Sequence, residues 1–374
     1  MNIAIMGLGV VGKGVYELVK NNHPEFNIKY ILELDEEKKV GISTPCANSW
    51  QEIIEDEEID AIVELIGGIP LAYQIIKSAL IAKKHVVTAN KAVISKYYEE
   101  LMTLADENNV FLRYEAAVGG GIIVLSPLDI FAKTSKVQDI QGIINGSTNF
   151  VLSKMFMDDF DLKDALKLAF ELGFLESGNN EDIEGLDLMR KMIILSSISY
   201  HHFFKENDCS INALNHLTKE YIDYLKGKDL IMKLIGKSFR KGQEIMLHID
   251  PVIFDKNHLY NQVNYEQNII EFKGDNMKNL SFMGPGAGRY PTAASVLFDL
   301  FQIRLSVKLE YEFKGDSFTV NNDLVKYRYL LETKNKEFIK TPYVTKTELK
   351  EYLNGVVFYA RIDESIQSID IGKE

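Results

Sequence analysis

A glycine-rich turn near the N-terminus constrains the fold more than any other feature of the chain. Residues 2–6 read as a short buried strand, the letters GLGVVG follow at once at residues 7–12, and a helical pattern covers residues 13–20. A strand, a glycine-rich turn and a helix in this order are typical of a dinucleotide-binding domain. The sequence therefore predicts such a domain, against the alternative of a glycine-rich turn that holds no ligand.

Each glycine of this turn has its own task in that interpretation. Gly7 permits the tight turn, Gly9 lets the backbone approach a pyrophosphate, and Gly12 lets the helix pack close to the strand. The free N–H groups at the start of the helix supply an anion site. The residues of this turn that we expect to bind a cofactor are Gly7, Gly9, Val10, Val11 and Gly12.

The segments after the turn alternate between strand and helix patterns. A second strand at residues 28–34 contains Glu33, whose carboxylate, about twenty residues past the glycines, can accept hydrogen bonds from an adenosine ribose. Further elements are expected as strands at 61–65, 85–88 and 110–114 and helices at 71–82 and 97–108. This alternation predicts an α/β fold with a Rossmann-type doubly wound parallel sheet.

Composition sets limits on function. A chain of 374 residues, of which 46% are hydrophobic, can bury a sizeable core. Its formal net charge of −12 argues against nucleic acid as a partner, because phosphate binding needs a clustered cationic face. Two cysteines without CxxC spacing argue against a disulfide framework, and no apolar run reaches the length of a membrane span. These features predict a cytoplasmic protein with no membrane partner.

From about residue 125 the pattern changes. Strands are expected at 139–144, 230–239 and 244–252, the last closed by Pro251, and helices at 162–172, within the charged stretch from Asp182, and after the GPGAG letters at 284–288. Residues 306–374 carry strand-like patches, among them 327–331, and no chemistry that we can identify.

Three segments are ambiguous when each is taken alone. Lys91 follows a strand at the ligand-binding edge of the sheet, where it meets the cofactor or substrate or else points to water. The glycines at 119–121 expose backbone groups for a ligand or merely connect two lobes. Residues 182–191 hold five charged side chains, which form the solvated face of a helix or include groups with a chemical role.

Taken together, the motifs resemble homoserine dehydrogenase over residues 1–305. They are, in chain order, GLGVVG at 7–12, ELIGG at 64–68, VVTANKA at 86–92, EAAVGGG at 115–121, INGSTNF at 144–150, IEGLDLMRK at 183–191 and GPGAGRYPTA at 284–293. The resemblance implies the reversible, NAD- or NADP-dependent reduction of L-aspartate 4-semialdehyde to L-homoserine, a step toward threonine and methionine. Aldehyde reduction builds negative charge on oxygen, which a positioned ammonium both stabilises and protonates.

In this family the lysine that ends the EGxDxxxK pattern is the acid–base group, which corresponds to Lys191. Asp187 lies one helical turn earlier, so the two side chains share a face, and the carboxylate orients the lysine while helping to keep it protonated. Residues 188–195 make the helix apolar on most sides, and a lysine on a buried helix needs a partner or a purpose. Glu184 and Arg190 are expected to be solvated or structural charges.

The resemblance also assigns the substrate-binding residues, which are Glu176, Asp182, Gly146 and Ser147. Glu176 is expected to face the amino group of homoserine. One departure concerns the loop that follows it, because the chain has SGNN at 177–180 where the family usually has an ADP-containing sequence.

The remaining implied residues bind the cofactor and a cation. Lys91 stands at the junction of cofactor and substrate, where the resemblance counts it among the catalytic residues with Lys191 and Asp187. Gly67 and Gly286 contact the cofactor. A monovalent cation site for Na⁺ or K⁺, structural rather than catalytic, corresponds to Glu115 with the backbone of Val118, Gly120 and Ile122.

Two further departures from the family carry predictions. Where many relatives have a basic residue for the 2′-phosphate of NADP, this chain has Glu33, which repels phosphate and favours NAD, although Lys38 and Lys39 nearby argue the other way. Many relatives end in an ACT regulatory domain, and the tail here lacks its characteristic turn. We therefore expect weak or absent inhibition by threonine through such a site.

The resulting domain prediction has three parts: a dinucleotide-binding domain at 1–125 with 285–305, an α+β substrate and dimerisation domain at 126–284, and a C-terminal extension at 306–374. The resemblance implies a homodimer. Two rival interpretations stay open at this point, a related nicotinamide enzyme that acts on an amino acid at its amine, and a nucleotide-sensing protein that kept the fold and lost the chemistry.

Overall fold

The computed structural model describes residues 1–175, 180–307 and 318–366, and the chain forms two compact units. Unit 1 is Met1–Ile130 with a segment that begins at Ala287, and unit 2 is Phe131–Gly286 with the C-terminal part of the chain. Glu176 therefore lies outside the described residues, as do residues 308–317. Among the described residues, no helix has the length and apolar character that a membrane crossing requires.

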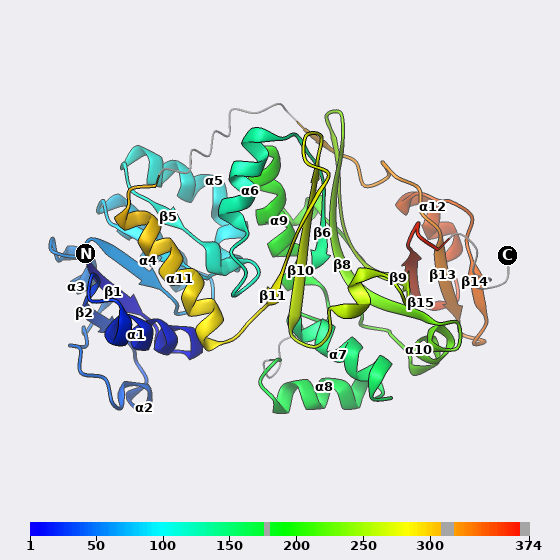
Figure 1. Ribbon diagram of the computed structural model, residues 1–374, viewed down its shortest axis with the longest axis horizontal. Helices are drawn as coiled ribbons and strands as arrows, with labels where there is room; N and C mark the ends of the chain where they lie inside the picture. The colour runs from blue at the N-terminus through cyan, green and yellow to red at the C-terminus, as the bar shows by residue number, and fades with distance from the viewer. Residues whose placement is uncertain (176–179, 308–317, 367–374) are drawn as a thin grey trace. The chain divides into compact units, whose positions relative to one another are not determined.

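Unit 1 contains a five-stranded parallel sheet with strand order β2-β1-β3-β4-β5. Figure 1 labels β1, β2 and β5 of this sheet. Its strands are β1 (Asn2–Met6), β2 (Asn27–Leu32), β3 (Ala61–Glu64), β4 (His85–Thr88) and β5 (Leu112–Arg113). Its helices are α1 (Val10–Asn22), α2 (Glu36–Lys39), α3 (Trp50–Glu55), α4 (Pro70–Ile81), α5 (Lys91–Glu107), η1 (Glu115–Ala117) and α11 (Arg289–Arg304), and α6 (Leu125–Thr134) follows η1. The predicted Rossmann-type sheet is confirmed, and the reversal of strand order between β1 and β3 marks the edge at which such sheets bind ligands.

The core of unit 1 explains why these strands are so apolar. Ile3 and Ile5 of β1 pack in one hydrophobic cluster with Val15 of α1 and Val296 of α11, while Met6, on the opposite side of the strand, is also fully buried. A parallel sheet covered on both faces needs strands that are apolar on both sides. Burial of both faces of the sheet therefore explains the continuous apolar run before the glycine-rich turn.

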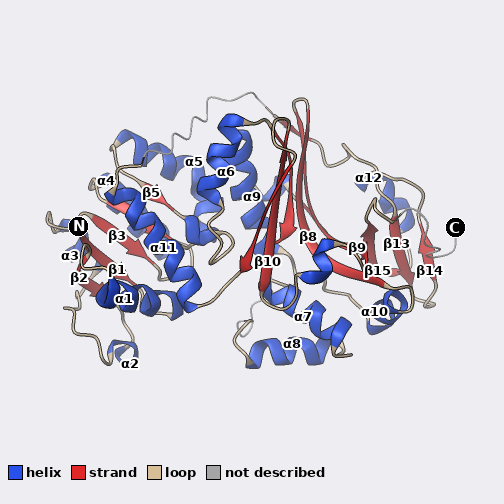
Figure 2. Ribbon diagram, viewed as in Figure 1, coloured by secondary structure: helices blue, strands red, loops and turns tan. Residues whose placement is uncertain are grey.

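Unit 2 is built on a mixed ten-stranded sheet; Figure 2 draws its strands, like those of unit 1, in red. Its strands are β6 (Val137–Ile143), β7 (Ser210–Ile211), β8 (Leu230–Lys241), β9 (Glu244–Asp255), β10 (Gln267–Gly274), β11 (Asn279–Pro285), β12 (Thr319–Val320), β13 (Tyr329–Thr333), β14 (Phe338–Lys340) and β15 (Val356–Ile362). Its helices are α7 (Gly146–Met157), α8 (Leu162–Glu171), α9 (Leu186–Tyr200), η2 (Glu206–Asp208), α10 (Lys219–Lys226), η3 (Leu259–Gln262), α12 (Lys346–Leu349) and η4 (Lys350–Tyr352). The described residues 318–366 thus extend this sheet, since β15 pairs in parallel with β9.

Helix α9 is buried over almost its whole length, as its apolar residues predict. From Leu188 to Tyr200 every side chain except that of Arg190 is buried. The helix lies close to β8, because a Cβ on Gly236 would stand 2.5 Å from Cγ of Met192. A glycine in the strand therefore makes room for the helix that carries Asp187 and Lys191.

Some predicted boundaries were wrong. The strand expected to close at Pro251 continues to Asp255. Pro251 lies between the residues of β9 that pair with β7 and those that pair with β15, so its missing N–H interrupts neither pairing. The helix expected from residue 97 begins at Lys91, since Asn90 caps it, and Tyr97 is a kink with φ −118° and ψ 22°. The antiparallel pair β10–β11 was not predicted at all.

Candidate active site

In unit 1 the glycines between β1 and α1 have different surroundings. A Cβ on Gly7, where φ is +98°, would lie 2.5 Å from the carbonyl oxygen of Leu65, and one on Gly12 would lie 2.0 Å from that of Gly7. Both positions therefore require glycine. A Cβ on Gly9 meets no described atom within 4 Å, and Gly9 is the N-cap residue of α1, where it supplies no side-chain hydrogen bond. The open space and the uncapped N–H groups fit a pyrophosphate. The structure thus brings together Gly7, Gly9, Val10, Val11 and Gly12 at the start of α1.

Glu33 stands just beyond β2, and backbone N–H groups hold its carboxylate. Oε2 accepts a hydrogen bond from the N–H of Leu8 at 2.8 Å, and Oε1 accepts from Leu34 at 2.8 Å and Asp35 at 3.0 Å. Burial raises the pKa of Glu33, but these hydrogen bonds outweigh burial and lower the pKa overall. The carboxylate is therefore anionic, and its bond to Leu8 ties it to the glycine-rich turn.

The two lysines near Glu33 each have a carboxylate partner. Lys38 Nζ lies 3.6 Å from Oδ2 of Asp35, and Lys39 Nζ lies 2.7 Å from Oε1 of Glu36. The pairing with Glu36 raises the pKa of Lys39. Their charges are thus partly neutralised within the short helix α2.

A chain of hydrogen bonds joins the turn after β3 to the start of α5. The buried carboxylate of Glu64 accepts from the hydroxyl of Thr88 at 2.6 Å and from the N–H of Ile66 at 2.9 Å. Asn90 caps α5 by accepting from the N–H of Val93, and its Nδ2 donates to the carbonyl oxygen of Gly68 at 2.6 Å. Sequence reasoning missed this network, although an asparagine directly before a helix is a recognisable cap.

Two predicted residues, Gly67 and Lys91, border this network. Gly67 has φ +82°, which favours glycine, and a Cβ there would meet no described atom within 4 Å. Lys91 is the first residue of α5, directly after its cap. Both follow the carboxyl ends of parallel strands, where α/β sheets bind ligands.

Glu115 and the glycines after it form a buried loop in unit 1. Its carboxylate accepts from the N–H groups of Val124, Leu125 and Ser126 at 2.6 to 3.0 Å and from the Ser126 hydroxyl at 2.7 Å. These bonds are consistent with a cap on α6. The carbonyl oxygen of Gly120 accepts from the hydroxyl of Ser295 at 2.6 Å. Backbone carbonyl oxygens of the loop, which include those of Val118 and Ile122, are hard ligands of the kind that suit Na⁺ or K⁺.

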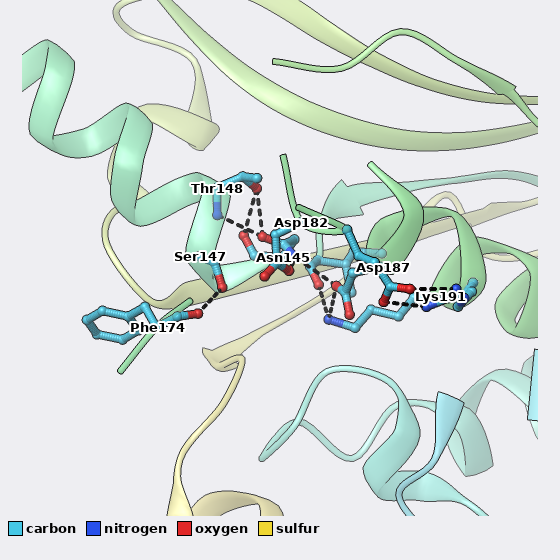
Figure 3. Close-up of polar contacts among 10 residues, drawn as sticks. Asn145, Ser147, Thr148, Phe174, Asp182, Asp187 and Lys191 are labelled. Atoms are coloured by element: carbon cyan, nitrogen blue, oxygen red, sulfur yellow. Dashed lines mark hydrogen bonds and ion pairs between the residues drawn. The ribbon is translucent and has the colours of Figure 1, made fainter. Parts of the chain in front are cut away.

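In unit 2, Lys191 forms an ion pair with Asp187 (Figure 3). Its Nζ lies 2.8 Å from Oδ2 of Asp187 and donates to the carbonyl oxygen of Ile144 at 2.7 Å, and the two charged side chains are only 11% and 7% exposed. An ammonium has three protons to donate. Within the described residues, two acceptors therefore leave one proton of Lys191 for another group.

Asn145 connects Asp187 to Asp182 (Figure 3). Its Nδ2 donates to Oδ1 of Asp182 at 2.5 Å and to Oδ2 of Asp187 at 2.7 Å. Its Oδ1 caps α7 by accepting from the N–H of Thr148 at 2.7 Å. The structure thus brings Asp182, Asp187 and Lys191 together, and it adds Asn145, which sequence reasoning did not select.

Gly146 and Ser147 open helix α7, directly after Asn145. The Ser147 hydroxyl donates to the carbonyl oxygen of Phe174 at 2.7 Å. A Cβ on Gly146 would stand 3.3 Å from the carbonyl oxygen of Glu266, so this backbone is close-packed. Both predicted residues therefore adjoin the cluster of Asp182, Asp187 and Lys191.

Arg190 is not solvated, which corrects one of the two interpretations offered from sequence. Its guanidinium makes two hydrogen bonds to the carboxylate of Glu181, at 2.6 and 3.0 Å, and its side chain is only 12% exposed. The backbone carbonyl of Glu181 accepts from the N–H of Leu186 at 2.8 Å. Arg190 thus fixes the turn that carries Asp182 to the helix that carries Lys191.

Gly286, predicted to contact the cofactor, stands directly after β11 in unit 2. A Cβ there would lie 2.2 Å from the side-chain amide of Asn268, and its N–H donates to the carbonyl oxygen of Glu266 at 3.1 Å. A larger residue at this position would therefore have to displace the buried amide of Asn268.

Comparisons with known proteins agree with this geometry. Two family models match, "Homoserine dehydrogenase, NAD binding domain" over residues 7–115 and "Homoserine dehydrogenase" over 124–301. The Bacillus subtilis homoserine dehydrogenase is 34% identical over 85% of this chain and 76% of its own, and the Methanocaldococcus jannaschii enzyme is 30% identical over 82% and 100%. A crystal structure of a homoserine dehydrogenase from Thiobacillus denitrificans is 26% identical, with a TM-score of 0.87 over 97% of this chain and 98% of its own. A hyperthermophilic archaeal homoserine dehydrogenase in complex with NADPH is 25% identical, with a TM-score of 0.70 over 82% and 98%.

The Rossmann-type sheet with its glycine-rich turn, together with these matches, defines a nicotinamide-dependent dehydrogenase. Its substrate is a small molecule. The chain belongs to the homoserine dehydrogenase family, the NAD(P)-dependent oxidoreductases that interconvert L-aspartate 4-semialdehyde and L-homoserine in amino-acid biosynthesis.

Proposed function

We propose that Lys191 is the acid–base group of this reaction. The observation that carries the proposal is the buried ammonium, held by Asp187 and by the carbonyl oxygen of Ile144 with one proton left to donate. During reduction, that proton passes to the oxygen of L-aspartate 4-semialdehyde as negative charge develops there. In the reverse direction the neutral amine accepts the proton of the homoserine hydroxyl. The bound nicotinamide supplies the hydride.

Asp187 orients Lys191 in this proposal, and Asp182 with Glu176 binds the substrate. The carboxylate lies one helical turn from the lysine, and its Oδ2 stands 2.8 Å from Nζ, so it fixes the direction of the ammonium. A carboxylate also suits the amino group of the substrate, and Gly146 with Ser147 adjoins the same cluster. Unit 1 binds the nucleotide through its glycine-rich turn, Gly67 and Lys91.

The test is Asp187→Asn, compared with Asp158→Asn. Lys154 and Asp158 form a matched pair four residues apart in the same unit, at 2.7 Å but more exposed. We expect Asp187→Asn to lower kcat for aspartate semialdehyde at least about tenfold, and Asp158→Asn to leave kcat unchanged. Equal kcat in both variants would remove Asp187 from the mechanism.

We infer a preference for NAD over NADP. The anionic carboxylate of Glu33 repels a 2′-phosphate, and Lys38 and Lys39, which could attract one, are paired with Asp35 and Glu36. We expect a higher kcat/KM for NADH than for NADPH, and a smaller difference in Glu33→Gln. A clear advantage for NADPH in the wild-type enzyme would contradict this assignment.

We further propose a monovalent cation in the loop of Glu115, held by Glu115 and by the backbone of Val118, Gly120 and Ile122. Its role is structural, so Na⁺ or K⁺ should raise the Tm of the enzyme relative to choline chloride at equal ionic strength. Equal Tm values in all three salts would exclude the site.

A homodimer and a cytoplasmic location complete the proposal. Strand β11 ends the strand order of the sheet and exposes Met283 at 59%, and an exposed edge strand can pair with a second copy. Light scattering on the purified enzyme tests the dimer. The free thiols of Cys46 and Cys209 suit a reducing compartment, which fractionation of cells tests directly.

A further inference from the structure

We propose that Asn145 is a positioning residue that holds Asp182 and Asp187 in a single arrangement around Lys191. The inference rests on the proposed roles of these charged residues. The inference adds a neutral residue, Asn145, to these charged residues. Asn145 affects the reaction only through the two carboxylates that it holds.

The side-chain amide of Asn145 has no hydrogen-bonding capacity left over. Nδ2 donates one proton to Asp182 and the other to Asp187, at 2.5 and 2.7 Å. Oδ1 accepts from both the N–H and the hydroxyl of Thr148, at 2.7 and 2.8 Å. With only 3% of the residue exposed, water cannot readily replace these partners. The amide is therefore locked in one orientation, and it fixes the positions of both carboxylates.

The charges of the cluster explain why an amide is needed at this position. Two carboxylates that reach the same nitrogen atom repel each other. Because Asp187 is buried and Asp182 is half-buried, this repulsion is screened less than at the surface. One neutral amide that donates to both holds them together without adding charge. Asn145 also caps α7, and the positive end of a helix dipole stabilises nearby carboxylates.

The backbone next to Asn145 completes the arrangement (Figure 3). The carbonyl oxygen of Ile144 accepts from Lys191 at 2.7 Å, so two consecutive residues contact all three charged side chains. A shift at the junction of β6 and α7 would therefore move the ammonium and both carboxylates together. The junction between β6 and α7 therefore sets the positions of the charged groups in the proposed proton-transfer site.

Substitutions can separate the bridge from the helix cap. Serine is as good a cap as asparagine but is too short to donate to two carboxylates, so Asn145→Ser keeps α7 capped and loses the bridge. Asn145→Asp keeps the shape and the cap but places a third carboxylate beside two others. The control is Asp161→Ser, which exchanges the exposed N-cap residue of α8. Oδ1 of Asp161 accepts a hydrogen bond from the N–H of Asp164, and Asp161 contacts no described residue of the site.

The experiment measures kcat and KM for aspartate semialdehyde and the Kd for NADH in these variants. We expect kcat to fall about 10- to 100-fold in Asn145→Ser, because the variant loses two hydrogen bonds to charged groups. In Asn145→Asp we expect kcat to fall further. The Kd for NADH should stay at the wild-type value in both, which shows that they fold, and Asp161→Ser should match the wild type throughout.

The outcomes separate this inference from the proposal on which it rests. If Lys191→Ala is inactive and Asn145→Ser keeps the wild-type kcat, Asn145 does not position the carboxylates, although the proposed function stands. If Lys191→Ala keeps its activity, the proposed function fails first. If Asn145→Ser does not fold, the isosteric Asn145→Asp decides, because wild-type kcat with a third carboxylate present would overturn the inference.

Discussion

The ion pair between Arg190 and Glu181 gives a prediction whose size can be worked out from the structure. The two side chains make two charge-assisted hydrogen bonds, at 2.6 and 3.0 Å. Fully exposed pairs contribute about 0–1 kcal/mol, and buried hydrogen bonds to charged groups about 1.5–3 kcal/mol. Arg190 is 12% exposed but Glu181 is 39% exposed, so the pair lies between these limits. We expect a coupling energy of about 1–2 kcal/mol.

A double-mutant cycle measures this coupling. The free energy of unfolding in urea is determined for the wild type, Arg190→Met, Glu181→Gln and the double variant, which isolates the pairwise contribution. The control cycle uses Lys167 and Glu171, a pair at 3.9 Å whose side chains are 73% and 55% exposed. Its coupling should be close to zero. If the two cycles gave the same coupling, the argument from burial and geometry would be wrong.

The same variants connect stability to function. The carbonyl oxygen of Glu181 accepts from the N–H groups of Leu186 and Asp187 at 2.8 and 3.3 Å, so a loosened Glu181 shifts the start of α9. Arg190→Met should therefore raise KM for aspartate semialdehyde, while Lys167→Met should not.

Two further predictions concern the glycine-rich turn and a buried lysine. Gly12→Ala places a Cβ 2.0 Å from the carbonyl oxygen of Gly7 and should lower both the Tm and the affinity for NADH. Gly9→Ala, whose Cβ meets no described atom within 4 Å, should weaken NADH binding but leave the Tm of the free enzyme unchanged. Equal losses of Tm in the two variants would contradict the distinction. Burial lowers the pKa of Lys233 to about 7. Between about pH 7 and pH 10.5 the unfolded state therefore binds more protons. The unfolding free energy of the wild type relative to Lys233→Met should rise there by about 1.4 kcal/mol per pH unit. Parallel pH dependences of the two proteins would refute the assignment.

The sequence predicts the parts of this enzyme that depend on neighbouring residues. The strand, turn and helix of residues 2–22 follow from local patterns, because the glycine spacing and the apolar strand each have a direct structural cause. The shared face of Asp187 and Lys191 follows in the same way from helical periodicity, and their 2.8 Å ion pair confirms it.

Contacts between distant segments could not be predicted in this way. Asn145 lies 37 residues before Asp182 and 42 before Asp187, and no local pattern says that its amide reaches both. Arg190 looked like a surface charge for a different reason: its partner Glu181 lies nine residues earlier, outside the helix, where helical spacing gives no guide. The strands at the C-terminal end were equally hidden, since β15 joins the sheet through β9, more than a hundred residues earlier.

The most direct test of the central claim is the steady-state reduction of L-aspartate 4-semialdehyde by Lys191→Ala. If Lys191 donates the proton, kcat should fall by about 10²- to 10⁴-fold, the usual contribution of a positioned acid, while the Kd for NADH remains that of the wild type. A purified Lys191→Ala enzyme that turns over at the wild-type rate would contradict the proposed mechanism.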